Sequence, residues 1–531
     1  MPTRKQKPRR AIVASFPAPT GGLVSNRNLA IARTPDAPPG AAVLEDMFPT
    51  ATGVVLRRGM QRWASIQVDV PVKSVFSYIS GLTKQIFAGN ANGIRDITTV
   101  SDPNTFSGPD VLTGQTSGDW VTVQFSTAGG NFLVGVNGED PAFVYDGSTF
   151  GATTITFPAG YTQTTADLSF VWVYKQRIWF IERDSLNAWY LPVDQIGGEL
   201  TLFPMGGIFT RGGSLLWGQA WSLASGGSGG LSEQCVFTTT EGEVAAYQGL
   251  SPDPDQGWTK VSEYRIGIPM GKKAFIRAGG DIVIATTVGF ISLATASRLD
   301  YAALGQGAVS YPIEDDWAQA VQERGQDDWR CQVWAEGQMV LVAPPTPAGA
   351  SPVLFVANSN TGKWATFTNW DVTAFESFQG RLIFGSRDGA VRQGWVTGAD
   401  EGIQYVGKVL PLFDDLGAPA SLKVMKVARA IIRSAVPVTE RLSGQVNYRV
   451  NFPSAPAVSV TPSGSVWDAG IWGTDIWDAV PGTVVSGDWF SIGGSGHDVA
   501  VGVQITSGNV VPLDAEIIRI DLTYSVAEVV T

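Results

Sequence analysis

Short apolar runs separated by glycine-containing turns dominate the middle of the chain. The recurring unit is a strand, a tight turn, a second and strongly apolar strand, and a turn that often contains Asp-Gly or Asn-Gly. The clearest copy is Arg381–Gly385, which is followed by Asp388-Gly389. These dipeptides favour hairpins because a type I′ turn needs positive φ at both central residues. The pattern predicts a succession of β-hairpins.

The spacing of these units indicates a repeat architecture. Intervals of 47, 46, 57, 47, 57 and 43 residues separate the equivalent positions Ile86, Leu133, Trp179, Val236, Val283, Val340 and Ile383. Repeats of roughly 40–50 residues with four short strands are typical of β-propeller blades. We therefore predict an all-β fold with a β-propeller of about seven blades (six to eight) over residues 54–400. Hairpins of stacked β-sandwiches are the alternative, but near-constant spacing favours the propeller.

Each of the two longer intervals contains an insertion. One is the glycine-rich stretch Met205–Gly230, and the other is Ile313–Arg324. Trp317 and Val321 lie four residues apart in the second insertion, which is the spacing of one helix face. We expect a helix there.

The regions on either side of the repeats have different residue patterns. Residues 1–53 contain Pro-rich turns and predict an extended N-terminal arm, because proline disfavours helix in its neighbourhood. Residues 401–531 predict a β-sandwich, because polar and apolar residues alternate there as in half-buried strands. The segments that show the alternation are Lys423–Arg433, Val446–Val450, Val499–Ile505 and Glu516–Tyr524.

Residue counts restrict the chemistry. The chain has one histidine, His497, and two cysteines, Cys235 and Cys331, so His-rich and Cys-rich metal sites are excluded. His497 lies in a Gly- and Ser-rich segment that we interpret as a surface loop. The acidic pairs at 315–316, 327–328 and 414–415 are interpreted as solvated surface, because neighbouring strand residues point to opposite faces. The sequence predicts no enzymatic activity, no cofactor and no metal.

Charge is distributed unevenly. The net charge is −11, and the first ten residues carry five cations; without these the remainder has about −16. An acidic body argues against tight binding of nucleic acid, which requires a basic surface. No apolar run reaches the length of a membrane-spanning helix, and no secretory signal is expected. The five cations are Arg4, Lys5, Lys7, Arg9 and Arg10.

Tryptophans mark a second candidate interface. Trp467, Trp472 and Trp477 are spaced by five residues, which matches neither a helix nor a strand and indicates a structured loop. Tryptophan is enriched at interface hot spots, although packing within the chain is its commoner use. Together with the basic arm and Trp317, this loop is a candidate surface for contact with another subunit.

Several passages resemble tail proteins of short-tailed bacteriophages. The resemblance extends over most of the chain and points to the tail nozzle or hub protein, also described as the packaged-DNA stabilisation protein. The passages are Ala18–Leu23, Pro39–Pro49, Gly53–Trp63, Ile313–Trp317, Gly380–Val391 and the Trp-Asp-Ala-Gly-Ile-Trp segment Trp467–Trp472.

The resemblance implies a homo-hexamer that forms the distal tail tube of the virion, below the head–tail adaptor protein. It implies contacts with tail fibre or tail needle proteins, and assembly in the host bacterial cytoplasm. Genomic DNA would be retained and then conducted through the channel without sequence-specific binding, and an acidic wall would let phosphates slide past. A propeller-fold glycosidase or carbohydrate-binding surface protein is the alternative, and a monomeric scaffold propeller is a third.

Overall fold

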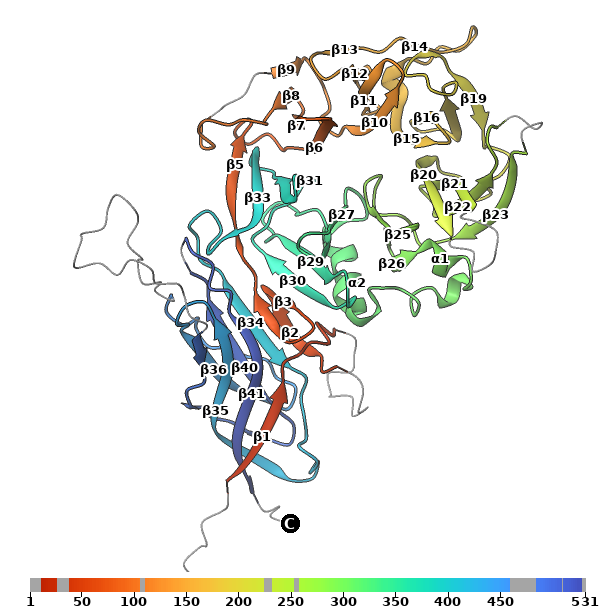
Figure 1. The fold of residues 1–531 in the computed structure, drawn as a ribbon. Helices are drawn as coiled ribbons and strands as arrows, with labels where there is room; N and C mark the ends of the chain where they lie inside the picture. Colours follow the sequence, from red (N-terminus) through yellow and green to blue (C-terminus); the bar gives the residue numbers. More distant parts are fainter. Residues whose placement is uncertain are drawn as a thin grey trace, which may run out of the picture. The chain divides into compact units, whose positions relative to one another are not determined.

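The computed structural model describes residues 11–25, 38–105, 110–223, 232–252, 257–458, 484–508 and 510–527. Strands predominate, and the chain divides into two compact units (Figure 1). Unit 1 comprises residues 1–61, 355–369 and 394–531, and unit 2 comprises residues 62–354 and 370–393. The chain therefore passes between the units within β5 (Gly59–Ser65), β29 (Val353–Asn358) and β33 (Ala390–Thr397), and again after residue 369.

Unit 2 is built from small antiparallel sheets that follow one another along the chain. Four of them have four strands each and contain no strand from unit 1. They are β6 (Ser74–Ser80), β7 (Thr83–Asn90), β8 (Gly93–Asp96) and β9 (Asp110–Thr113); β10 (Val121–Thr127), β11 (Gly130–Val136), β12 (Phe143–Tyr145) and β13 (Phe150–Ala152); β15 (Leu168–Tyr174), β16 (Arg177–Glu182), β17 (Asn187–Tyr190) and β19 (Thr201–Pro204); and β20 (Leu215–Leu223), β21 (Ser232–Thr239), β22 (Glu243–Gln248) and β23 (Thr259–Arg265).

The remaining strands of unit 2 complete the arrangement. Three strands form the sheet β24 (Phe275–Ala278), β25 (Asp281–Thr286) and β26 (Gly289–Ser292). The hairpin β27 (Arg330–Trp334) and β28 (Met339–Ala343) follows. The last sheet has the order β31 (Ala374–Phe378), β32 (Arg381–Gly385), β33, β5. Two short strands, β14 (Ile155–Thr156) and β18 (Gly198–Glu199), form a separate parallel pair.

The first strands of these sheets follow one another around a closed ring. β6 contacts β10, and the contacts continue through β15, β20, the sheet of β24 and β25, β27 and β31 before returning to β6. This is a β-propeller, as predicted, with a blade number within the predicted range (Figure 1). Each equivalent position from Ile86 to Ile383 lies on the second strand of its sheet.

Turn chemistry explains why the hairpins form where the sequence predicts them. Gly389 of the Asp388-Gly389 turn has φ of 82°, a conformation that side chains rarely adopt. A Cβ at this glycine would lie 1.5 Å from the carbonyl oxygen of Gln67. The turn between β32 and β33 therefore requires glycine for both conformation and space.

The structure describes the second insertion fully and the glycine-rich insertion only in part. Helix α2 (Glu314–Arg324) confirms the predicted helix, and it buries Trp317 and Val321. A shorter helix, α1 (Leu293–Ala296), precedes it, capped by the Ser292 hydroxyl. Three-residue 3₁₀ turns occur at Thr165–Asp167, Tyr301–Ala303 and Tyr311–Ile313. In the glycine-rich stretch, residues 224–231 lie outside the described ranges.

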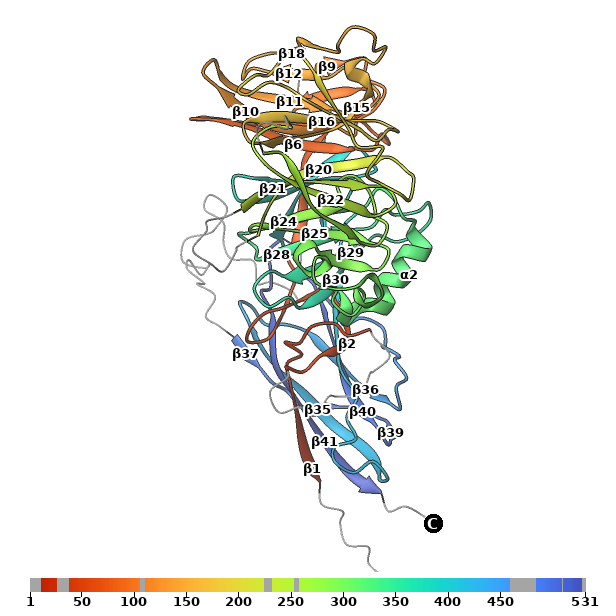
Figure 2. The ribbon, with the colours of Figure 1, turned by 90° about the vertical axis from the view of Figure 1, so that its right-hand side faces the viewer.

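Unit 1 contains two groups of strands. One runs in the order β30 (Trp364–Thr368), β2 (Ala41–Glu45), β34 (Val406–Pro411), β40 (Val499–Thr506), β36 (Glu440–Val446). The other is centred on β35 (Leu422–Ser434) and β41 (Glu516–Ala527), the long neighbouring strands seen in Figure 2. Its smaller members are β1 (Ile12–Pro17), β3 (Met47–Pro49), β4 (Val54–Leu56), β37 (Val484–Ser486), β38 (Phe490–Ser491) and β39 (Ser495–Gly496).

The start of the chain is part of unit 1. β1 pairs with β41 over its whole length, from Ile12 opposite Tyr524 to Pro17 opposite Arg519, and β2 lies between β30 and β34. These boundaries differ from the predicted arm at 1–53 and sandwich at 401–531, because four N-terminal strands complete the C-terminal sheets. The predicted strand Val446–Val450 is also corrected, since β36 ends at Val446 and a turn follows.

Candidate functional site on the propeller axis

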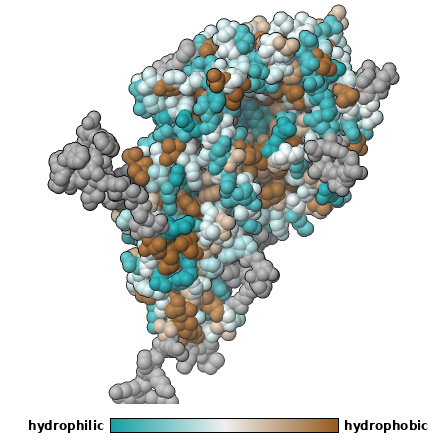
Figure 3. Space-filling view, viewed as in Figure 1, coloured by the Kyte–Doolittle hydropathy of each residue, from teal (hydrophilic) through white to brown (hydrophobic). Residues whose placement is uncertain are grey.

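A cavity of about 360 Å³ lies on the axis of unit 2. The first strand of each sheet in the ring, called here the inner strand, contributes to its wall. Figure 3 shows this face of the unit hollowed at its centre. The lining residues include aromatics, of which Phe275 on β24 is partly exposed, whereas Phe76 on β6 and Phe170 and Trp172 on β15 are buried. The basic lining residues are Lys272, Lys273, Arg277 and Arg330.

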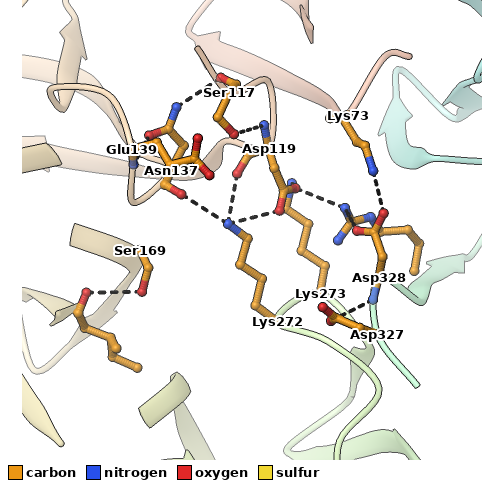
Figure 4. Close-up of polar contacts among 12 residues, drawn as sticks. Lys73, Ser117, Asp119, Asn137, Glu139, Ser169, Lys272, Lys273, Asp327 and Asp328 are labelled. Carbon is orange, nitrogen blue, oxygen red and sulfur yellow. Dashed lines mark hydrogen bonds and ion pairs between the residues drawn. The ribbon is translucent and has the colours of Figure 1, made fainter. Parts of the chain in front are cut away.

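Asp119 organises the basic residues (Figure 4). It lies two residues before β10, and its carboxylate accepts from the Lys273 ammonium at 2.9 Å, the Lys272 ammonium at 3.0 Å and the Arg330 guanidinium at 3.1 Å. The Lys272 ammonium also donates to the Asp119 carbonyl at 3.1 Å. Both lysines come from the turn that precedes β24, and Arg330 is the first residue of β27. Two distant segments of the chain thus bring three cations to one carboxylate.

The electrostatics of this cluster follow from burial and from cation crowding. Burial alone would raise the pKa of Asp119, but Lys273, Arg330 and Lys272 together hold it well below its ordinary value. The pKa of Lys273 is lowered to about 8. Burial is the main cause, repulsion from Arg330 and Lys272 adds to it, and attraction to Asp119 only partly offsets them. The Asp119 carboxylate is therefore the shared counter-ion of three cations.

Asp328 extends the cluster outward. Its carboxylate accepts from the Lys73 ammonium at 2.5 Å and also pairs with Arg330. The Arg330 guanidinium additionally donates to the Thr373 carbonyl at 3.0 Å. The interpretation of the 327–328 pair as solvated surface is thus corrected for Asp328, which is 37% exposed but forms ion pairs with two cations.

A further carboxyl group lines the cavity. Glu376 on β31 is half-buried and accepts a hydrogen bond from the Ser77 hydroxyl at 2.8 Å. Burial raises the pKa of Glu376 to about 7, and the Ser77 hydrogen bond only partly offsets it. At neutral pH this side chain is therefore partly protonated.

The structure places the predicted interface residues as follows. Trp317 is 2% exposed, its indole N–H donates to the Thr286 carbonyl at 2.9 Å, and its ring lies 5.1 Å from that of Trp329. A buried indole cannot offer its ring to another subunit, so the proposed interface role of Trp317 is not supported. The other candidates, Arg4, Lys5, Lys7, Arg9, Arg10, Trp467, Trp472 and Trp477, lie outside the described residues.

Of the other residues singled out in the sequence, Cys235 is buried on β21 and Cys331 is half-buried on β27, and the rest lie at the surface or in turns. His497 is exposed, and Asp414 and Asp415 each accept a backbone N–H two residues ahead, at Leu416 and Gly417. Asp315 lies in the first turn of α2. Within the described ranges, no group of three or more His, Cys, Asp or Glu side chains is placed to hold a metal ion. Nor does any described helix have the length and apolarity needed to cross a membrane.

Unit 1 contains a buried charged cluster, two members of which lie in the passages that resemble phage tail proteins. The Arg57 guanidinium, 1% exposed, donates to the Asp46 carboxylate at 2.5 Å and to both carboxylate oxygens of Asp400, at 2.6 and 2.9 Å. The guanidinium also donates to the Thr368 carbonyl at 3.1 Å and lies 3.6 Å from the centroid of the Tyr405 ring. We call Arg57, Asp46 and Asp400 the Arg57 clamp.

Sequence reasoning did not identify the axial cluster. Its members Asp119, Lys272 and Arg330 are far apart in the chain, and no motif spacing joins them. The adjacent lysines Lys272 and Lys273 were the available signal, because such a pair stands out where 16% of residues are charged. Only the closed ring of inner strands shows that these residues meet.

No family model matches the chain, and neither does any curated protein. Among solved structures it is similar to BBS1N in complex with ARL6DN, with a TM-score of 0.39, 10% identity and coverage of 66% of this chain and 99% of that chain. It is also similar to Saccharomyces cerevisiae Sqt1 (0.34, 11%, 63% and 99%) and to Chaetomium thermophilum Raptor (0.36, 9%, 65% and 29%). The propeller assignment rests on the strand order of this chain, and these similarities do not bear on function.

Proposed function

We propose that the chain is a structural virion protein that forms the distal tail tube, or nozzle, of a short-tailed bacteriophage. Six copies would surround a channel that retains packaged DNA and conducts it during ejection. The observation that carries the proposal is the Arg57 clamp. Asp46 and Arg57 come from the passages that resemble the tail proteins, and the clamp joins them to Asp400 in the interior of unit 1. Two residues of these passages therefore have a structural role in unit 1.

A tube requires contacts that close a ring between copies, and β1 offers a suitable surface. β1 pairs with β41 along one edge, and its side chains Ile12 and Val13 are 42% and 62% exposed. An exposed apolar edge strand is a surface that natural proteins cover or protect. In the proposed assembly a neighbouring copy covers β1.

Net charge is compatible with conduction of DNA. The chain carries −11, and a channel wall between copies that is acidic on average would repel phosphates and let DNA slide. The proposed partners are the head–tail adaptor above the tube and tail fibre or tail needle proteins below it. Assembly would take place in the host bacterial cytoplasm.

Mass in solution, followed by imaging, tests the proposal. We expect the purified chain, mixed with the head–tail adaptor, to form rings with about six times the 56.4 kDa mass of one chain. Val13→Lys places a charge on the exposed edge of β1 and should prevent ring closure. Val68→Lys alters a side chain that is 79% exposed in unit 2 and should leave the rings intact.

The alternative function predicts different results in the same experiments. A glycosidase or carbohydrate-binding propeller would remain monomeric with the adaptor and would bind or cleave surface polysaccharide. A persistent monomer in the presence of adaptor would therefore contradict the tail-tube proposal. Release of reducing ends from polysaccharide would favour the alternative.

A further inference from the structure

The axial cavity has the dimensions and walls of a small-molecule site. Pockets for small ligands span about 300–1,000 Å³ and combine apolar walls with a few placed polar groups. The volume here is about 360 Å³, and the partly exposed aromatic side chains at its wall are Phe275 and Phe375. An aromatic ring of a ligand could pack edge-to-face or offset against such side chains.

The charge of the wall is positive, although the whole chain is acidic. Four cations line the cavity against one carboxyl, that of Glu376. Counting Asp119, which pairs with three of these cations, leaves two cations in excess. The Lys73–Asp328 pair does not change this excess, because it adds one charge of each sign. Asp327, beside Asp328, reduces the excess but leaves it positive.

Two of these cations have capacity for another anion. The three cations on Asp119 repel one another, and the pKa of Lys273, lowered to about 8, reflects burial together with that crowding. Arg277 is exposed at the cavity wall, and its guanidinium has no hydrogen bond or ion pair within the described part of the chain. An anion placed here would relieve the repulsion and satisfy the Arg277 guanidinium.

We propose that the axial cavity binds a small aromatic anion, with its ring against Phe275 and its phosphate or carboxylate group against Arg277 and Lys273. Arginine forks and lysine ammonium groups bind such oxyanions through charge-assisted hydrogen bonds. This site lies within a single copy of the propeller and does not depend on the proposed tail assembly.

Calorimetric titration of the full chain with phenyl phosphate tests the site. Inorganic phosphate provides the anion without the ring, and benzyl alcohol provides the ring without the anion. We expect phenyl phosphate to bind at least about tenfold more tightly than either, because it alone uses both walls. Equal or weaker binding of phenyl phosphate would overturn the proposal.

Charge variants localise the binding. Arg277→Gln should weaken phenyl phosphate binding about tenfold, since it removes one charge-assisted contact from an exposed position. Lys260→Gln is the matched control, because it removes a cation that pairs with Glu263 on the outer strand β23. Glu376→Gln should strengthen binding several-fold, since it removes the negative charge from the wall. Equal effects of the Arg277 and Lys260 variants, or weaker binding by the Glu376 variant, would refute the placement.

Discussion

Replacing Arg57 with methionine should destabilise unit 1 strongly, because it leaves two buried carboxylates without their cation. Asp46 and Asp400 are 1% and 2% exposed, so water cannot take over the solvation that the guanidinium provides. Removing one partner of a buried ion pair costs about 3–5 kcal/mol, and here both carboxylates lose the same partner. For a unit of this size, such a loss corresponds to a fall in melting temperature of about 6–20 °C.

Scanning calorimetry is the appropriate assay, because it gives the melting temperature of each variant directly. The neighbouring Arg58→Met is the control. Arg58 pairs with Asp514 at 2.8 Å, but the two side chains are 39% and 42% exposed, so the loss should be below about 1 kcal/mol. Equal stabilities of the two variants would refute the reasoning.

A compensated variant separates loss of charge balance from loss of packing. Combining Arg57→Met with Asp46→Asn and Asp400→Asn removes all three charges, so no buried carboxylate remains unpaired. The large cost of breaking a buried ion pair comes from the uncompensated charge that remains, and the two amides carry no charge. We expect the triple variant to recover most of the stability lost in Arg57→Met. A triple variant no more stable than the single one would show that packing, and not charge, explains the loss.

Two further predictions concern unit 2. The pKa of Glu376 is about 7 in the folded state and 4.5 in the unfolded chain. The stability that this group contributes is therefore complete below pH 4.5 and is lost as pH rises through 7. Between about pH 5 and 8, wild type should therefore lose up to about 3 kcal/mol relative to Glu376→Gln in urea unfolding; parallel pH profiles would contradict this. Gly389→Ala should cost more than about 2 kcal/mol because its Cβ meets the Gln67 carbonyl, whereas Gly160→Ala, with φ of 97° and open space, should cost only about 1 kcal/mol. Similar unfolding midpoints for the two glycine variants would show that the close approach is not the cause.

The propeller could be predicted from the sequence because its signal is local and repeated. A hairpin turn such as Asp388-Gly389 fixes the pairing of its own flanking strands, and regular intervals place the marked positions on the second strand of every sheet. Helix α2 was accessible for the same reason, since the spacing of Trp317 and Val321 defines one buried face. Each of these features depends on residues that are close in sequence.

The tertiary structure alone decided which distant segments meet. The extended N-terminal residues carry no local sign of their partners, and only long-range pairing joins Ile12 to Tyr524 and makes β1 part of the β41 sheet. Charge patterns have the same limitation, because Asp119 and Lys273 read separately are ordinary polar residues. Closure of the ring brings them to 2.9 Å and burial then shifts their pKa values, so the axial site is a property of the fold and not of any one segment.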